Sequence, residues 1–289
     1  MKKIAVFGAN GFIGKNVAES LSNKYFLLTP TRNEVDLTQE AKVDRFFKSN
    51  RVDIVINCAV VGGSRKEEYQ TNMLDENLRM FFNLARNKKY FGKLIHLGSG
   101  AEYDKGKTLK KVNENDFNKA VPKDGYGFYK YICSKYIENA ENIVNLRIFG
   151  LFGKYEDYRF RFISNAICRN IFGMPILINQ DVYFDYLYID DFVKILEYFI
   201  KNNTKQKFYN IGTGKPVNLS KIANIINKIS LFKSDIIIKT KGLGNEYTCD
   251  NSLLIKEVGQ VKLTSLIESI QDLLSWYKDN KNLIDPNLI

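Results

Sequence analysis

The chain contains one histidine, one tryptophan, five prolines and four cysteines among its 289 residues. Cys58, Cys133, Cys168 and Cys249 are far apart and form no C-x-x-C pair, so we expect neither a metal site nor a disulfide framework. Free cysteines are typical of a reducing cytoplasm. The single histidine, His96, lies within the apolar stretch KLIHLGS, where we expect a structural role.

Long apolar runs and long basic runs are also absent. The apolar run at the N-terminus is short and leads into glycines, which argues against a signal peptide, and no run is long enough to span a membrane. The net charge is +11, but the lysines are scattered singly or in pairs. This spacing argues against nucleic-acid binding, although the positive charge would help to attract an anionic substrate. The length allows one large domain, with or without a smaller lobe.

The most informative segment is the N-terminal MKKIAVFGANGFIG. A predicted buried strand at residues 4–7 is followed by Gly8, Gly11 and Gly14, which is G-x-x-G-x-x-G at a strand-to-helix turn. Glycines at these positions allow the sharp turn, a close approach to a diphosphate and tight helix packing. The pattern predicts a nucleotide cofactor, and the alternative is a glycine-rich turn in another kind of α/β protein.

Strands and helices alternate through the first half of the chain, which predicts a parallel sheet with right-handed crossovers, a Rossmann-type doubly wound α/β fold. Strands are expected at 4–7, 25–29, 52–59, 93–98, 143–149 and 208–211, and helices at 16–22, 41–48, 75–87, 126–140 and 190–201. Further helices at 161–170, 218–229 and 263–278 and a strand at 175–179 predict a smaller α/β lobe. We expect a cofactor domain at 1–152 plus about 184–214, and a substrate lobe at 153–183 and 215–289.

The second predicted strand ends in the segment TPTRNEVDL. An acidic residue at this place usually holds the ribose 2′-hydroxyl of NAD, whereas a cation suits the 2′-phosphate of NADP. Arg32 stands there, and the nearest acid, Glu34, is two residues further on. The segment therefore favours NADP(H) over NAD, and the alternative is an ordinary surface arginine.

Later in the chain, three residues form a candidate catalytic set. Ser99 stands at the end of the strand 93–98, and Tyr126 and Lys130 are spaced i, i+4 on one helix face. An ammonium group beside a phenol stabilises the phenolate, and a serine hydroxyl can hold the reacting oxygen. The set suits hydride transfer to or from a carbon that bears oxygen. Tyr126 would exchange the proton, although a Y-x-x-x-K pair alone is common by chance.

In this order, the motifs resemble the extended short-chain dehydrogenase/reductase family of nucleotide-sugar epimerases, dehydratases and reductases. GANGFIG matches its glycine motif, and YGFYK matches its Y-G-x-S-K, except that Tyr129 replaces the usual serine. The segments FDYLYIDDFVKIL, FYNIGTGKPVNLSKIA and the C-terminal region are also similar. Beyond the three glycines, Arg32 and Lys130, the resemblance implies these cofactor contacts: Asn10, Phe12, Ile13, Asp36, Leu37, Cys58, Ala59 and Val60.

Within the family, TRNEVDL and HLGSGAEY resemble the 4-ketoreductase branch that includes GDP-fucose synthase. That enzyme also epimerises, with a cysteine that here is Ala101 and with a histidine, and no histidine follows His96. The dehydratases have an Asp-Glu pair where this chain has Gly100 and Ala101. Simple ketone reduction needs only the serine, tyrosine and lysine, so it is the favoured reaction. A 4-epimerase with bound NAD and a non-catalytic dinucleotide sensor are the alternatives.

The substrate diphosphate lacks one of its usual partners. Many family members have an arginine just before the aspartate of a late R-D-F/Y motif, and here Phe184 precedes Asp185. Another cation would have to replace it, and Arg159, Arg161 and Arg169 are candidates.

The resemblance thus implies a cytoplasmic, NADPH-dependent enzyme that reduces a nucleotide-linked (GDP-, dTDP- or CDP-) 4-keto deoxysugar or heptose for surface polysaccharide precursors. It also implies a homodimer that pairs the helices at 75–87 and 126–140. The nucleotide and the sugar are not determined by the sequence.

Overall fold

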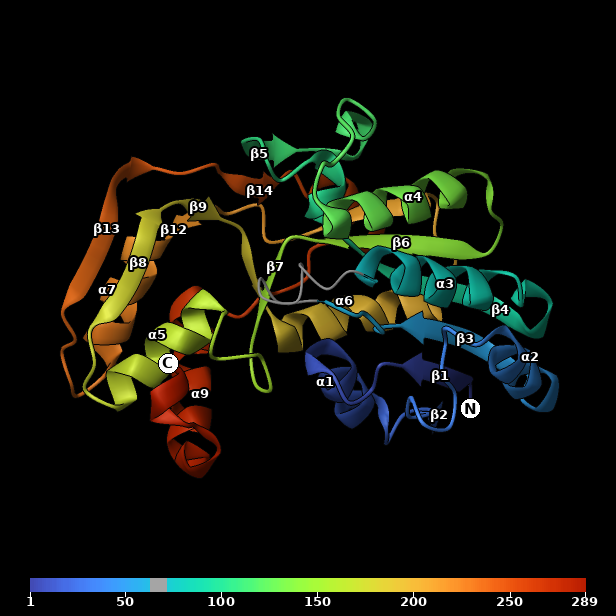
Figure 1. The fold of residues 1–289 in the computed structure, drawn as a ribbon, viewed down its shortest axis with the longest axis horizontal. Helices are drawn as coiled ribbons and strands as arrows, with labels where there is room; N and C mark the ends of the chain where they lie inside the picture. The colour runs from blue at the N-terminus through green and yellow to red at the C-terminus, as the bar shows by residue number, and fades with distance from the viewer. Residues whose placement is uncertain (63–71) are drawn as a thin grey trace.

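The computed structural model describes residues 1–62 and 72–289, which form a parallel sheet between helices with a smaller lobe at one end (Figure 1). The strands of the main sheet follow the order β11-β6-β4-β3-β1-β2, and every pairing between neighbours is parallel. They are β1 (Lys3–Phe7), β2 (Phe26–Leu28), β3 (Val52–Asn57), β4 (Phe91–Ser99), β6 (Ile143–Ile148) and β11 (Phe208–Ile211). The predicted Rossmann-type fold is confirmed.

Helices cover both faces of this sheet. On one face lie α1 (Phe12–Leu21) and α6 (Ile189–Lys201), and on the other α2 (Glu40–Ser49), α3 (Met73–Ala85) and α4 (Gly125–Asn139). Strand β1 shows why both faces must be covered, since successive side chains of a strand point to opposite faces. Ile4 and Val6 belong to the core under α1 and α6, while Ala5 and Phe7 belong to the core under the other three helices.

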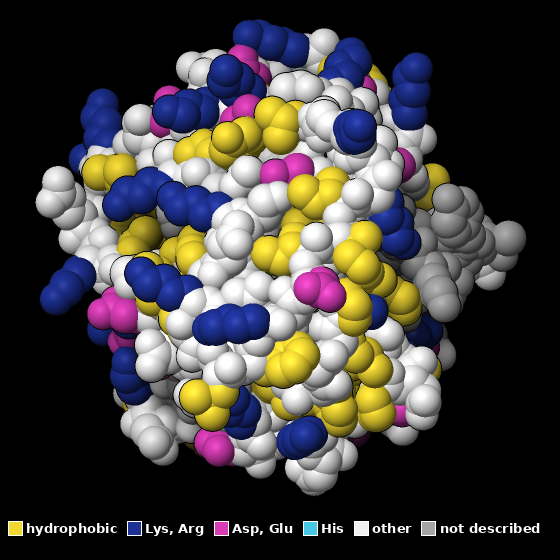
Figure 2. Space-filling view, turned by 90° about the vertical axis from the view of Figure 1, so that its left-hand side faces the viewer, with side chains coloured by type: hydrophobic (Ala, Val, Ile, Leu, Met, Phe, Trp, Pro, Cys, Tyr) yellow, Lys and Arg dark blue, Asp and Glu magenta, His cyan; other side chains and the backbone are white. Residues whose placement is uncertain are grey.

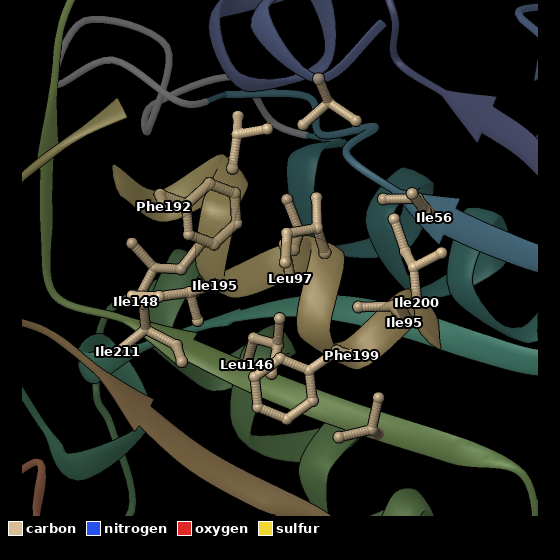
Figure 3. Packing of buried hydrophobic residues seen from close by; sticks show 14 of the residues in the cluster. Ile56, Ile95, Leu97, Leu146, Ile148, Phe192, Ile195, Phe199, Ile200 and Ile211 are labelled. Carbon is tan, nitrogen blue, oxygen red and sulfur yellow. The ribbon is translucent and has the colours of Figure 1, made fainter. Parts of the chain in front are cut away.

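The core under α6 is built from aliphatic residues of the central strands and from aliphatic and aromatic residues of the helix (Figure 3). Phe192 and Phe199 extend from α6 toward Leu97 of β4 and Leu146 of β6, and all four side chains are buried. Such burial is the main favourable term in folding. It fixes β4 in the middle of the sheet, and the end of β4 carries Ser99.

The smaller lobe contains a third core, which α5 (Phe162–Ile171), α7 (Leu219–Ile229) and α9 (Leu266–Asp279) share with a strand pair, β8 (Ile176–Asp181) and β13 (Ile236–Leu243). The lobe adjoins the main sheet near the parallel pair β7 (Gly150–Phe152) and β10 (Tyr186–Tyr188). The strand β13 was not expected from the sequence, because most of its residues are exposed and no alternating pattern marks it.

Two elements make contacts between the two expected parts of the chain. Strand β5 (Leu109–Val112) pairs with β14 (Tyr247–Cys249) in a sheet that continues through β9 (Tyr183–Phe184) to β12 (Val217–Asn218). Helix α8 (Ser252–Val258) places Leu254 in the core of the main sheet. The C-terminal part of the chain therefore packs against both lobes.

Short 3-10 helices complete the described fold: η2 (Lys88–Tyr90), η3 (Gly100–Tyr103), η4 (Glu114–Asp116), η5 (Lys281–Leu283) and η6 (Pro286–Leu288). In the part of the chain that the structure describes, no helix is both long enough and apolar enough to cross a membrane. The four cysteines are unpaired with one another. At the lobe end of the molecule, lysine and arginine side chains lie dispersed among apolar and uncharged groups (Figure 2).

Candidate active site

The glycine motif opens into a cleft of about 830 Å³ at the carboxyl ends of β1 and β3. In a doubly wound sheet, ligands bind at this edge where the strand order reverses. The volume is in the range of ligand-binding pockets. The cleft is lined by most of the expected cofactor residues, namely Gly8, Asn10, Gly11, Phe12, Ile13, Arg32, Asp36, Leu37, Cys58, Ala59 and Val60, and by Tyr126.

Each of the three glycines is required for a different structural reason. Gly8 has φ +79°, and a Cβ there would lie 2.6 Å from the amide nitrogen of Ala59. A Cβ at Gly14 would lie 2.1 Å from the carbonyl oxygen of Gly8, so Gly14 permits α1 to approach β1. A Cβ at Gly11 would meet only that same oxygen, at 3.4 Å, so Gly11 leaves room beside the cleft.

Helix α1 begins four residues earlier than the sequence predicted, at Phe12. Gly11 is its N-cap and provides no side-chain hydrogen bond, and the first turn contains no acidic residue. The first N–H groups of a helix have no partner within the helix and attract anions. The N-terminus of α1 therefore fits a phosphate in the cleft.

Arg32 is the cation at the end of the second strand, and its guanidinium lies 3.5 Å from the carboxylate of Glu76 on α3. The carboxylate of Glu34 accepts hydrogen bonds from the N–H and hydroxyl of Thr31, and Glu34 does not line the cleft. Burial alone would raise the pKa of Asp36, but hydrogen bonds from Thr38 outweigh it and the pKa is lowered. The cation, and not Glu34, thus faces the ligand space.

Ser99 is held rigidly at the end of β4. Its N–H donates to the Glu102 carboxylate at 3.0 Å, and its Oγ accepts from the N–H of Ala101 at 3.1 Å, which is a capping box. The hydroxyl of Tyr247 lies 3.4 Å from the same Oγ. Either hydroxyl can donate in this contact, and when Tyr247 donates, the Ser99 proton is free for a substrate oxygen.

Glu102 is not available as an acid in the cleft. Its carboxylate is fully buried and pairs with the Nε of Arg147 at 2.6 Å. Ser134 of α4 and Asn145 of β6 donate to the same carboxylate. A buried ion pair needs such additional hydrogen bonds to offset its loss of hydration. The network ties the turn that bears Ser99 to the helix that bears Tyr126.

Tyr126 and Lys130 lie in the first two turns of α4, whose N-cap Asp124 accepts from the N–H of Gly127. Tyr126 lines the cleft, whereas Lys130 is buried beneath it and donates to the carbonyl of Leu97. The Lys130 Nζ lies 6.0 Å from the centre of the Tyr126 ring and 5.0 Å from that of Tyr129. An ammonium is attracted to an aromatic face at such distances.

Aromatic side chains occupy the space beside Gly100, the position at which the resemblance implies an acid in dehydratases. A Cβ at Gly100 would lie 2.7 Å from both the Phe149 ring and the Tyr247 hydroxyl. Burial raises the pKa of Tyr247 far above its ordinary value, so its phenol stays neutral. The residues beside Ser99 therefore supply hydroxyl groups and apolar surface.

The lobe contributes the segment 155–161 to the same cleft. Arg159 and Arg161 line it, and Arg159 forms a two-point ion pair with Asp157. Arg169, the third candidate for the diphosphate, instead donates to the carbonyl of Pro175. Three arginines around one cleft, counting Arg32, fit a ligand with several phosphates, as NADP(H) has.

Several expected residues lie outside this cleft or are inert. Gly14, Ser99 and Lys130 do not line it. Burial raises the pKa of the Cys58 thiol to about 12, which leaves it protonated. Burial and the charge of Lys130 hold the pKa of His96 well below its usual value, so His96 is a neutral core residue beside Asn57.

Sequence reasoning missed Tyr247 and Leu288. Tyr247 lies 148 positions from Ser99, and Leu288 reaches the cleft from the C-terminal end. No local pattern marks either residue, because each enters the site only through the packing of the lobe.

Three comparisons relate this chain to known proteins. Residues 4–212 match the model of the NAD dependent epimerase/dehydratase family. GDP-L-colitose synthase of Yersinia pseudotuberculosis is 24% identical over 307 residues, which cover 97% of this chain and 99% of that protein.

Solved structures share the fold. The GDP-mannoheptose C4 reductase MlghC of Campylobacter jejuni, with NADP bound, has a TM-score of 0.81 at 22% identity and covers 96% of this chain and 98% of its own. The UDP-glucose 4-epimerase of Thermotoga maritima has a TM-score of 0.84 at 20% identity and covers 96% and 99%.

Proposed function

The chain belongs to the NAD dependent epimerase/dehydratase family, and we propose that it reduces the C4 ketone of a nucleotide-linked 4-keto sugar with NADPH. The observation that carries this proposal is that the glycine motif, Arg32 and Tyr126 line the same cleft. The names of its relatives support the substrate class, since they include a GDP-L-colitose synthase and a GDP-mannoheptose C4 reductase. GDP-, dTDP- and CDP-linked deoxysugars or heptoses are the candidates.

The cofactor would be held by groups at both ends of the cleft. The N-terminus of α1 would face its diphosphate, Arg32 its 2′-phosphate, and residues 36–37 and 58–60 its adenosine side and central part. When bound, NADPH supplies the hydride that goes to C4 of the sugar and remains as NADP⁺.

The chain's own residues would manage the proton and the oxygen. Ser99 would donate a hydrogen bond to the C4 oxygen, and Tyr126 would transfer its phenolic proton to that oxygen, which gives the alcohol. Lys130 would stabilise the resulting phenolate, which water then reprotonates. No further acid or base is needed.

We also propose that the protein is a cytoplasmic homodimer. Phe82 of α3 and Tyr136 of α4 are 37% and 39% exposed, and their rings lie 5.3 Å apart. Exposed aromatic groups on neighbouring helices are typical of protein interfaces. This face is the one that the family resemblance implies.

The test mixes the purified protein with NADPH or NADH and a panel of GDP-, dTDP-, CDP- and UDP-linked 4-keto sugars. We expect loss of the reduced-nicotinamide absorbance with one substrate and NADPH, and much less with NADH. No consumption with any of them, together with NAD released on denaturation, would contradict the proposal and favour a 4-epimerase.

The control is Tyr126→Phe, which removes the proton donor and keeps the ring. We expect turnover to fall by about 10² to 10⁴-fold while NADPH still binds. Unchanged turnover in this variant would exclude the assigned role of Tyr126.

A further inference from the structure

A tight turn follows the short helix that begins after Ser99. Asp104 leaves η3 with φ +69°, and its carbonyl accepts from the N–H of Lys107 at 3.0 Å. Its carboxylate also accepts from the N–H of Gly106. This geometry fixes the direction in which Lys105 leaves the turn.

The turn lies against the start of α4. A Cβ at Gly127 would be 2.8 Å from the carbonyl oxygen of Ala101, so the first turn of α4 packs closely on η3. Because of this contact, a side chain from the turn reaches the N-terminus of α4, where Tyr126 is located.

The side chain that does so is Lys105. Its Nζ lies 5.5 Å from the centre of the Tyr126 ring and 3.3 Å from the carboxylate of Asp124. Asp124 is also the N-cap of α4, so the ion pair fastens the turn to the helix. The Lys105 side chain is 34% exposed and thus partly shielded from water.

Among the residues that the structure describes, two ammonium groups from two elements face Tyr126, Lys105 from the turn and Lys130 from its own helix. In the described part of the chain, its other titratable neighbours are Asp124, Tyr129 and Tyr247. The two tyrosines stay neutral because burial raises the pKa of each. Asp124 carries the opposing charge and is already paired with Lys105.

We propose that Lys105 is a second cation that acts through Tyr126, stabilising the phenolate formed during proton transfer and orienting its ring. At this separation a unit charge shifts the balance between phenol and phenolate, and partial burial reduces screening by salt. The inference rests on the proposed function in one respect, that Tyr126 is the proton donor. Sequence reasoning missed Lys105 because its distance from Tyr126 is set by the turn.

The first test needs no substrate. The protein is labelled with [ζ-¹³C]tyrosine, and the Tyr126 resonance is identified by its absence in Tyr126→Phe. In Lys105→Met we expect the titration midpoint of this resonance to move to higher pH, because a cation beside the phenolate is lost. Lys105→Arg keeps the charge and should stay near the wild-type midpoint.

Lys107→Met is the matched control, since Lys107 lies in the same turn, is 68% exposed and pairs with Asp104. It should leave the midpoint unchanged. An unchanged midpoint in Lys105→Met, or an equal rise in Lys107→Met, would overturn the proposal.

The second test follows ketone reduction against pH. Lys105→Met should lower kcat and move the basic limb, on which the protonated tyrosine is lost, to higher pH. A fall in kcat with the limb unmoved would show a merely structural role and overturn the proposal. If no substrate is reduced, the proposed function fails, while the resonance of Tyr126 still decides the role of Lys105.

Discussion

Arg32 is the residue on which the preference for NADPH depends. Its guanidinium already faces Glu76, so a bound 2′-phosphate would compete with that carboxylate. We expect Arg32→Gln to weaken NADPH binding about 10- to 100-fold and to leave NADH binding unchanged, because a hydrogen bond to a charged group contributes about 1.5–3 kcal/mol.

Glu76→Gln is the matched variant and should bind NADPH as well as the wild type or up to about fivefold more tightly, since exposed ion pairs are weak. Fluorescence titration with each cofactor measures both variants. Equal weakening of NADPH and NADH in Arg32→Gln would show that Arg32 does not read the 2′-phosphate.

Glu156 is a second residue for which we expect a specific effect, a dependence of the protein's stability on pH. It lines the cleft, is buried, and accepts a hydrogen bond from Ser164 at 2.7 Å. Burial raises the pKa of its carboxyl from 4.5 to about 8. Between these values the folded state holds a proton that the unfolded state has lost, so the stability contributed by this group falls as pH rises through that window.

We therefore expect Glu156→Gln to unfold at a higher temperature than the wild type at pH 8 and at a similar temperature at pH 4.5. The difference in the free energy of unfolding between the two proteins should grow between these pH values. Its upper limit is about 1.4 kcal/mol for each unit by which folding raises the pKa of Glu156. Thermal unfolding at pH 4.5, 6.5 and 8 measures it. A difference that does not change with pH would contradict the raised pKa.

At the scale of elements, two glycines of the β1–α1 turn have different roles, one in folding and one in cofactor binding. A Cβ at Gly14 would collide with the carbonyl of Gly8, whereas a Cβ at Gly11 meets it only at 3.4 Å, on the side of the cleft. We expect Gly14→Ala to be strongly destabilised, since the backbone of the turn must move to admit it.

Gly11→Ala should fold like the wild type and lose at least about tenfold in NADPH affinity, because the added methyl group would occupy space near the diphosphate. Urea unfolding and NADPH titration distinguish the two variants. Wild-type NADPH affinity in Gly11→Ala would show that the diphosphate lies elsewhere.

The hydrogen-bond network around Glu102 connects several elements. It joins η3, α4 and β6, and Arg147 is stacked on Phe117 and Phe208 at 4.3 and 4.4 Å. Its members are buried and hydrogen-bonded, so it fixes the separation of Ser99 from α4 more firmly than surface contacts could.

At the scale of the whole molecule, the exposed faces of α3 and α4 are the expected dimer contact. We expect a wild-type mass in light scattering of about twice the 33.4 kDa of one chain, and a single-chain mass for Tyr136→Glu, because an interface charge without a partner opposes association. Phe232→Glu is the control, since Phe232 is 47% exposed on the lobe. A monomeric wild type would contradict the proposed dimer.

Much of the architecture was predictable because its signals are local. Short apolar strands, the G-x-x-G-x-x-G turn and the amphipathic helices predicted the parallel sheet and its order of elements. Helix α1 starts earlier than expected because it begins inside the glycine motif. The positions of Arg32 and Tyr126 in the cleft also follow from strand and helix ends.

The sequence by itself determined the parallel sheet, the glycine turn and which residue types could carry the chemistry, since these depend on spacing along a few turns or strands. Only the tertiary structure placed Tyr247 beside Ser99, Lys105 beside Tyr126 and Arg169 away from the cleft. These contacts join segments whose approach is set by core packing, and no local periodicity encodes such distances.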